Sequence, residues 1–104
     1  MTTQLDQTIE LPEPWYWTDQ DLSRQLDIEI SIDHPLKNKS VKTIARRQDK
    51  DDVLFQIIDG KYAVVHLTWQ QYPHSVNRWP TTVIFNTWDD VYQNRILQDE
   101  VDFK

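Results

Sequence analysis

The stretch that decides the fold runs over residues 53–69 and reads VLFQIIDGKYAVVHLTW. Two runs of β-branched, aromatic and other apolar residues flank the dipeptide Asp59-Gly60, and this pattern is typical of a β-hairpin. Asp-Gly is the preferred sequence of a two-residue type I′ loop, because both central residues of that loop need positive φ. Counting outward from such a loop predicts that Val53 pairs with His66.

Both faces of the predicted hairpin are apolar in this register. One face carries Val53, Phe55, Ile57, Tyr62, Val64 and His66, and the other carries Leu54, Ile58, Ala63, Val65 and Leu67. A strand pair that is apolar on both sides needs cover on both sides. We therefore expect the hairpin to lie centrally, with layers on each face or with a second copy of the chain in a homodimer.

Upstream of the hairpin, the patterns predict one short helix and two strands. Thr18 has a side chain suited to an N-cap, and a helix over residues 19–26 is expected after it. Isoleucines alternate with polar residues over residues 28–33, which is the period of a half-buried strand. Residues 41–47 indicate a second strand, although their apolar positions also fit helical spacing.

Downstream of the hairpin, residues 83–85 predict a last short strand. Thr87 is a second N-cap candidate, and the apolar spacing after it predicts an amphipathic helix over residues 88–98. Residues 1–14 are expected to be extended or flexible, and residues 99–104 to fray.

Together these elements predict one α+β domain over residues 1–104, with a mainly antiparallel sheet of four or five strands and two helices. The single glycine, Gly60, cannot build a glycine-rich phosphate loop, and no cysteine is present for a disulfide or a thiolate metal site. No cofactor is predicted. The chain lacks a secretory signal and an apolar run of about 20 residues, so we expect a cytoplasmic protein without membrane contact.

The charge is distributed unevenly. The chain has 17 acidic and 11 basic residues, for a net charge of −6. Residues 1–33 hold eight acids and one base, whereas residues 34–50 hold six bases and one acid. An acidic protein repels nucleic acid at long range, so nucleic acid is not an expected partner. We interpret the basic stretch as a solvated strand face paired with the acidic N-terminal segment, with phosphate contact as the alternative.

Five strings along the chain carry a resemblance. They are HPL (34–36), IARR (44–47), DDVLF (51–55), AVVHLTW (63–69) and WP (79–80). Through these strings, residues 34–97 resemble a group of short bacterial hypothetical proteins with no known activity. The resemblance implies a bacterial origin and a shared fold, and it carries over no catalytic residue, ligand or partner.

His66 is the strongest candidate for acid–base chemistry. In the counted register Asp51 lies diagonally across from it, at about 7–8 Å between Cα atoms. A hydrogen bond to Asp51 would orient the imidazole, as in acid–base sites. One hypothesis is therefore a site around His66, Asp51 and Arg46. The alternative is a histidine packed in the sheet beside a structural carboxylate.

The other titratable residues form weaker patterns. His34, His66 and His74 lack the spacing of metal ligands, and no metal is predicted. Asp51-Asp52 and Asp89-Asp90 are adjacent pairs rather than carboxylates on one face. They are therefore weak candidates for paired acid–base work.

The connection over residues 69–80 is the best candidate surface. Trp, Tyr and Arg dominate binding hot spots, and long loops in small domains are more often functional than short ones. The alternative is that the two tryptophans pack under the sheet and hold the loop in place. The residues predicted to bind a partner are Trp69, Tyr72, His74, Arg78 and Trp79.

These patterns favour a non-enzymatic bacterial protein that binds another protein through the 69–80 loop or an acidic face. Small acidic proteins of this kind include immunity-type and antitoxin-type inhibitors, whose charge speeds the capture of a basic target. The alternative function is a small enzyme or ligand-binding protein with its site near His66, Asp51 and Arg46.

Overall fold

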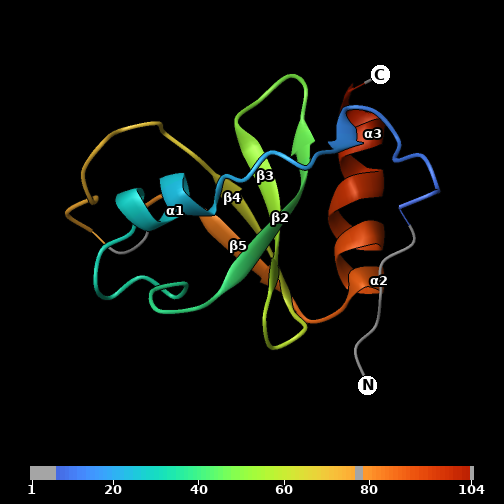
Figure 1. Ribbon diagram of the computed structural model, residues 1–104. Coiled ribbons are helices and arrows are strands. Elements are labelled where there is room, and N and C mark those ends of the chain that lie inside the picture. Colours follow the sequence, from blue (N-terminus) through green and yellow to red (C-terminus); the bar gives the residue numbers. More distant parts are fainter. Residues whose placement is uncertain (1–6, 77–78, 104) are drawn as a thin grey trace.

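A computed structural model describes residues 7–76 and 79–103 (Figure 1). These residues form a five-stranded antiparallel sheet in which each strand pairs with its neighbours in sequence. The strands are β1 (Trp15–Trp17), β2 (Val41–Arg47), β3 (Asp52–Ile57), β4 (Tyr62–His66) and β5 (Thr82–Phe85). Helix α1 (Ser23–Glu29) lies between β1 and β2. The predicted α+β class and antiparallel sheet are confirmed.

The C-terminal helix begins after the two residues Asn86 and Thr87, which connect it to β5. Its parts are α2 (Trp88–Val91), the π-helical segment η1 (Tyr92–Ile96) and α3 (Leu97–Phe103). Thr87 is the predicted N-cap, and its hydroxyl oxygen accepts a hydrogen bond from the N–H of Asp90 at 3.0 Å. The helix continues to Phe103, although the sequence predicts fraying from residue 99, because Asp99 is buried and hydrogen-bonded. Within the described residues, no helix is long and apolar enough to span a membrane.

The central hairpin forms, but its loop has three residues rather than the predicted two. The N–H of Ile57 donates to the carbonyl of Lys61 at 2.8 Å, and Gly60 donates to the carbonyl of Ile57 at 2.9 Å. Gly60 has a φ of 96°, which is the left-handed position of a three-residue loop built on a type I turn. The register therefore shifts by one residue, and His66 faces Asp52.

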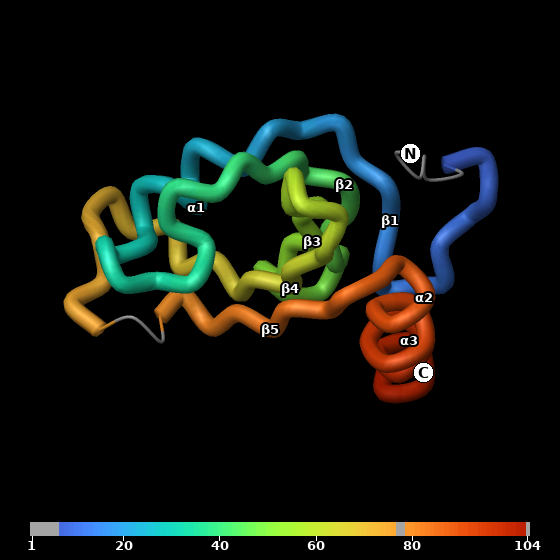
Figure 2. The backbone as a smooth tube through the Cα atoms, turned by 90° about the horizontal axis from the view of Figure 1, so that it is seen from below, coloured from blue at the N-terminus to red at the C-terminus, as the bar shows by residue number. Residues whose placement is uncertain are grey.

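In the observed register, the apolar side chains of the hairpin belong to two hydrophobic cores, one on each face of the sheet. Val53, for example, pairs with Val65, and both belong to the same core. On the C-helix face the buried residues are Leu11, Trp15, Ile44, Ala45, Leu54, Tyr62, Val64, Phe85, Val91 and Ile96. On the α1 face they are Leu22, Leu26, Ile30, Leu36, Val53, Phe55, Ile57, Ala63, Val65 and Leu67. Figure 2 shows α1 and the C-terminal helix on opposite sides of the sheet. The chain itself thus covers both faces, so an uncovered face no longer argues for a homodimer.

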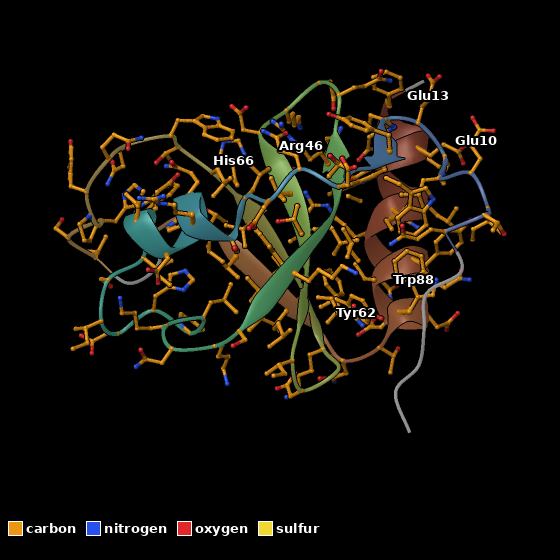
Figure 3. All side chains as sticks on the ribbon, viewed as in Figure 1. Glu10, Glu13, Arg46, Tyr62, His66 and Trp88 are labelled. Carbon is orange, nitrogen blue, oxygen red and sulfur yellow. The ribbon has the colours of Figure 1, made fainter. Side chains whose placement is uncertain are left out.

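Aromatic rings fasten the first turn of the C-terminal helix to the sheet. Trp88 stacks on Trp17 with 5.7 Å between ring centroids, and it meets Tyr62 edge-on at 5.8 Å. Figure 3 labels Tyr62 beside the sheet on the side of this helix, and Trp88 on the helix itself. Burial raises the pKa of Tyr62 above its ordinary value, since it disfavours the phenolate.

A β-bulge in β2 explains why its sequence also fits helical spacing. The register shifts between Thr43 and Ala45, so Ile44 and Ala45 together lie opposite Leu54. Both residues are buried in the core of the C-helix face. Two adjacent apolar residues on one face break strict alternation, but the predicted strand over residues 41–47 is confirmed.

Helix α1 lies later in the chain than predicted, and the predicted strand over residues 28–33 is wrong. Thr18 does not cap this helix; its hydroxyl oxygen accepts a hydrogen bond from the N–H of Gln20 instead. Ile32, one of the alternating isoleucines, is exposed. Burial at helical spacing outweighs the alternation. The residues that carry this spacing are Leu22, Leu26, Glu29 and Ile30.

Candidate functional site

A buried carboxylate holds the start of the 69–80 loop. Glu29, at the end of α1, is fully buried, and its side chain accepts four hydrogen bonds. Oε1 accepts from the N–H and the hydroxyl of Thr68 at 2.9 and 2.6 Å. Oε2 accepts from the N–H of Trp69 at 2.9 Å and from the side-chain amide of Gln25 at 2.8 Å. Burial alone would raise the pKa of Glu29, but the hydrogen bonds favour the charged form and bring the pKa below its ordinary value.

The backbone of Trp69 is strained. Its φ is 65°, in the left-handed region, where a bulky residue costs about 1–3 kcal/mol. The hydrogen bond from its N–H to Glu29 fixes this conformation. Trp69 is 39% exposed as a residue, so the strained position lies at the surface.

Arg46 lies against the ring of Trp69. The guanidinium carbon is 5.6 Å from the ring centroid, which is a cation–π contact. Arg46 comes from β2, where its cross-strand neighbour is the exposed Tyr16 of β1. One guanidinium nitrogen donates to the side chain of Gln20 at 2.9 Å, whereas Nε is buried without a partner among the described residues. The sheet thus presents an arginine between a tryptophan that it contacts and a tyrosine across the strand pair.

Some of the predicted partner-binding residues have exposed aromatic rings, whereas one of them holds the loop in place. Tyr72 and Trp79 are 66% and 40% exposed, so the loop aromatics lie at the surface rather than under the sheet. His74 supports the loop, because its N–H donates to the carbonyl of Glu29 at 2.9 Å. Arg78 lies outside the described residues. The aromatic surface is the name used below for the cation–π pair Arg46 and Trp69 together with the exposed loop residue Tyr72, which follows Trp69 by three residues.

His66 contacts Asp52 rather than the predicted Asp51. Nδ1 of His66 lies 2.7 Å from Oδ1 of Asp52, because the one-residue register shift sets these residues directly opposite each other. The other oxygen of Asp52 accepts a hydrogen bond from Arg95 at 2.7 Å. Arg46 lies on the α1 face, whereas His66 and Asp52 lie on the C-helix face. The structure therefore does not bring the hypothesised trio together.

Buried charges join the C-terminal helix to the sheet. Arg47 and Asp99 are both buried and lie 3.3 Å apart. Asp99 also accepts hydrogen bonds from the indole N–H of Trp15 and from Arg95, each at 2.8 Å. Burial would lower the pKa of Arg47, but a hydrogen bond to Asp49 and the surrounding carboxylates raise it. No local sequence pattern relates Trp15 to Asp99, which are 84 residues apart, so this network could not be predicted from the sequence.

A groove lies beside Arg46, with a volume of about 810 Å³. Glu10 and Glu13 contribute to it from the N-terminal segment (Figure 3), and Lys50 and Asp51 contribute from the turn after β2. Its walls carry charges of both signs. The groove therefore favours neither an anionic nor a cationic ligand.

The three histidines occupy different environments. His34 is buried; its Nδ1 accepts from the N–H of Leu36 at 3.1 Å, and its Nε2 lies 3.3 Å from the carbonyl of Pro80. Burial lowers the pKa of His34, because it disfavours the charged ring. Among residues 7–76 and 79–103, no group of three or more His, Cys, Asp or Glu is placed to hold a metal ion.

The basic stretch over residues 34–50 does not form one face. Arg46 lies on the α1 face, whereas Arg47 lies on the C-helix face and pairs with Asp49 and Asp99. In the part of the chain that the structure describes, the ion pairs of this stretch involve none of the acids of residues 1–33. The predicted pairing with the N-terminal segment is therefore not observed there.

Comparison of the chain with protein-family models, curated proteins and solved structures found no match.

Proposed function

We propose that this chain is a non-enzymatic, cytoplasmic protein-interaction module that binds a protein partner through the aromatic surface. The observation that carries the proposal is the left-handed backbone of Trp69. Strained residues persist only where their surroundings fix them, and such strain gathers at binding and catalytic sites. Here Glu29 supplies the fixing contact, and the ring of Trp69 is exposed rather than packed in a core.

The side chains of the aromatic surface suit protein recognition. Trp, Tyr and Arg dominate binding hot spots, since they combine a large contact area with a polar group. A partner that covers both Arg46 and Trp69 would remove water from their cation–π contact. Such contacts are worth about 2 kcal/mol or more when they are desolvated.

The net charge of −6 indicates a basic partner. Opposite net charges speed diffusional encounter and leave the short-range contacts to set specificity. Immunity-type and antitoxin-type inhibitors are small acidic proteins that capture basic targets, and this is the specific form that we propose.

A comparative pull-down from a bacterial lysate tests the proposal. The baits are the wild type, a Trp69→Asn/Tyr72→Ala double variant, and the control Val101→Ser, which changes an exposed residue of α3. Asparagine tolerates positive φ, so the double variant should keep the fold, as circular dichroism can verify. We expect one stoichiometric partner with the wild type and the control, and its loss with the double variant. Equal capture by all three baits would contradict the proposal.

One observation supports a second candidate function, which is acid–base chemistry at His66. Asp52 orients the ring through Nδ1, and the His66 side chain is half-exposed, which is the arrangement of a general base. A thermal-shift screen of small metabolites against the wild type and His66→Ala tests this candidate. A ligand that stabilises only the wild type would support it, and stabilisation of both chains would place the ligand elsewhere.

A further inference from the structure

The outer edge of β5 is open. β5 is the last strand of the sheet, and no strand in the described part of the chain pairs with its outer side (Figure 2). Its four residues carry no charge. Val83 and Ile84 point to opposite faces of the sheet and are 44% and 40% exposed. Proteins protect exposed edges with charge, proline, bulges or a covering segment, and the four residues of β5 include no charge and no proline.

The ladder between β4 and β5 determines which backbone groups point outward. The N–H of His66 donates to the carbonyl of Thr81 at 2.9 Å, so these residues form a hydrogen-bonded pair. Hydrogen-bonded and non-hydrogen-bonded pairs alternate along an antiparallel ladder. Val83 therefore bonds inward to β4, whereas Thr82 and Ile84 present their N–H and C=O groups outward.

The opposite edge of the sheet is short and partly occupied by the chain that precedes it. β1 has only three residues. The N–H of Trp15 donates to the carbonyl of Pro12 at 3.0 Å, and the indole N–H of Trp17 donates to the carbonyl of Ile9 at 2.7 Å. Pairing at β5 would therefore stop at two chains instead of continuing into a fibre.

We infer that the open edge binds β5 of a second copy of this chain, antiparallel about a twofold axis at Val83. Thr82 of each copy then lies opposite Ile84 of the other, and their outward groups exchange four hydrogen bonds. Val83 faces its own counterpart in a non-hydrogen-bonded pair, with about 4.5 Å between the Cα atoms.

The charge and side chains of β5 fit a second copy. Two chains of net charge −6 repel each other at long range. Because β5 is uncharged, pairing of two β5 strands adds no further repulsion between like charges at the contact itself. β-branched side chains also pair well across strands. Because a four-residue contact is much smaller than the roughly 1,200 Å² of a standard interface, we expect a weak, concentration-dependent dimer.

Cysteine substitution tests this register, because the chain has no cysteine of its own. In the proposed dimer, the two copies of Val83→Cys lie within the roughly 4.4–6.8 Å Cα separation that a disulfide spans. Ile84→Cys is the matched control, since it changes the next residue of the same strand at similar exposure but lies opposite Thr82. Under mild oxidation we expect Val83→Cys to form a covalent dimer on a non-reducing gel, and Ile84→Cys to remain monomeric. Equal cross-linking of the two variants would overturn the register.

Sedimentation equilibrium provides an independent measurement. We expect the wild type to dimerise with rising concentration. The dissociation constant of the Val83→Lys dimer should be at least about tenfold higher, because the two lysines would lie directly opposite each other. Circular dichroism verifies that the lysine variant is folded. A wild type that stays monomeric up to about 1 mM, or a dimer unaffected by Val83→Lys, would overturn the proposal. A monomeric chain whose edge instead captures an extended segment of another protein would overturn it as well.

Discussion

The carboxylate of Glu29 accepts a hydrogen bond at 2.9 Å from the backbone N–H of Trp69, the residue whose φ is 65°. This contact couples a buried charge at the end of α1 to the position of an exposed ring. Hydrogen bonds to a charged group contribute about 1.5–3 kcal/mol each, which is enough to offset backbone strain of about 1–3 kcal/mol. Substitutions of Glu29 and of Trp69 therefore test the same contact, one at the acceptor and one at the donor.

Glu29→Gln should lower the free energy of unfolding by about 3 kcal/mol. The amide keeps the shape of the side chain but removes the charge, and its NH₂ group faces donors that the carboxylate satisfied. Urea unfolding measures the loss, with Glu13→Gln as the control at an exposed position. A loss below about 1 kcal/mol would mean that the four hydrogen bonds are not important for stability.

Trp69→Asn should leave the free energy of unfolding within about 1 kcal/mol of the wild type, because asparagine tolerates positive φ. Trp69→Ala also removes the ring but keeps the strain, so it should be less stable than Trp69→Asn. Denaturant unfolding of both variants tests this order. Equal and large losses, above about 2 kcal/mol, would instead assign the ring a packing role.

Stability should fall on acidification in two ranges. The folded state keeps buried His34 neutral while the unfolded chain binds a proton near the ordinary pKa of 6.5, so stability decreases as the pH falls below that value. Glu29 contributes fully above its ordinary pKa of 4.5, and its contribution is lost as the pH falls from there through its lower folded pKa. Melting temperatures measured from about pH 8 to pH 3 should show both decreases. His34→Gln should make the decrease at the higher pH smaller. An unchanged pH profile in that variant would exclude His34 as the cause of this decrease.

Gly60→Ala should cost about 1 kcal/mol of stability. No heavy atom lies within 4 Å of a Cβ built at this position, so the cost comes from the φ of 96° alone. Gly60→Asn should cost less, since asparagine adopts positive φ more readily than alanine. Thermal unfolding of both variants gives the comparison, and an equal loss would indicate that φ is not the cause.

Asp99→Ala should destabilise the fold by about 2–3 kcal/mol, because the buried guanidinium of Arg47 keeps its hydrogen bonds to Asp49 but loses one carboxylate, and the indole N–H of Trp15 loses its acceptor. Asp102→Ala, at an exposed position of α3, is the matched control and should be nearly neutral. Chemical unfolding of the two variants measures the difference. Similar values for both would refute a stabilising role for the buried network.

The elements with strong local signals could be predicted from the sequence. The Asp-Gly hairpin, the strand over residues 41–47 and the Thr87 cap are determined by turn, strand and capping preferences that act over a few residues. Helix α1 was misplaced because the alternating isoleucines compete with helical spacing through Leu26 and Ile30. Their burial against the sheet, which is a tertiary effect, decides between the two patterns.

The candidate site was predicted less completely, for two physical reasons. A single extra loop residue before Gly60 moves every cross-strand pair, and this replaces Asp51 by Asp52 as the partner of His66. The contact of Glu29 with Thr68 and Trp69 spans 39 and 40 residues, and nothing near Glu29 in the sequence indicates it.

The hydrogen bond between Trp15 and Asp99 has a consequence for the order of folding. Each strand pairs with its sequence neighbours, so the sheet can form through short loop closures, whereas this bond closes a loop of 84 residues. We expect the sheet to assemble first and the C-terminal helix to dock after the rate-limiting barrier. Asp99→Ala would then accelerate unfolding and leave the refolding rate almost unchanged. On this view, the docked C-terminal helix sets the lifetime of the native state, while the hairpins set how quickly it is reached.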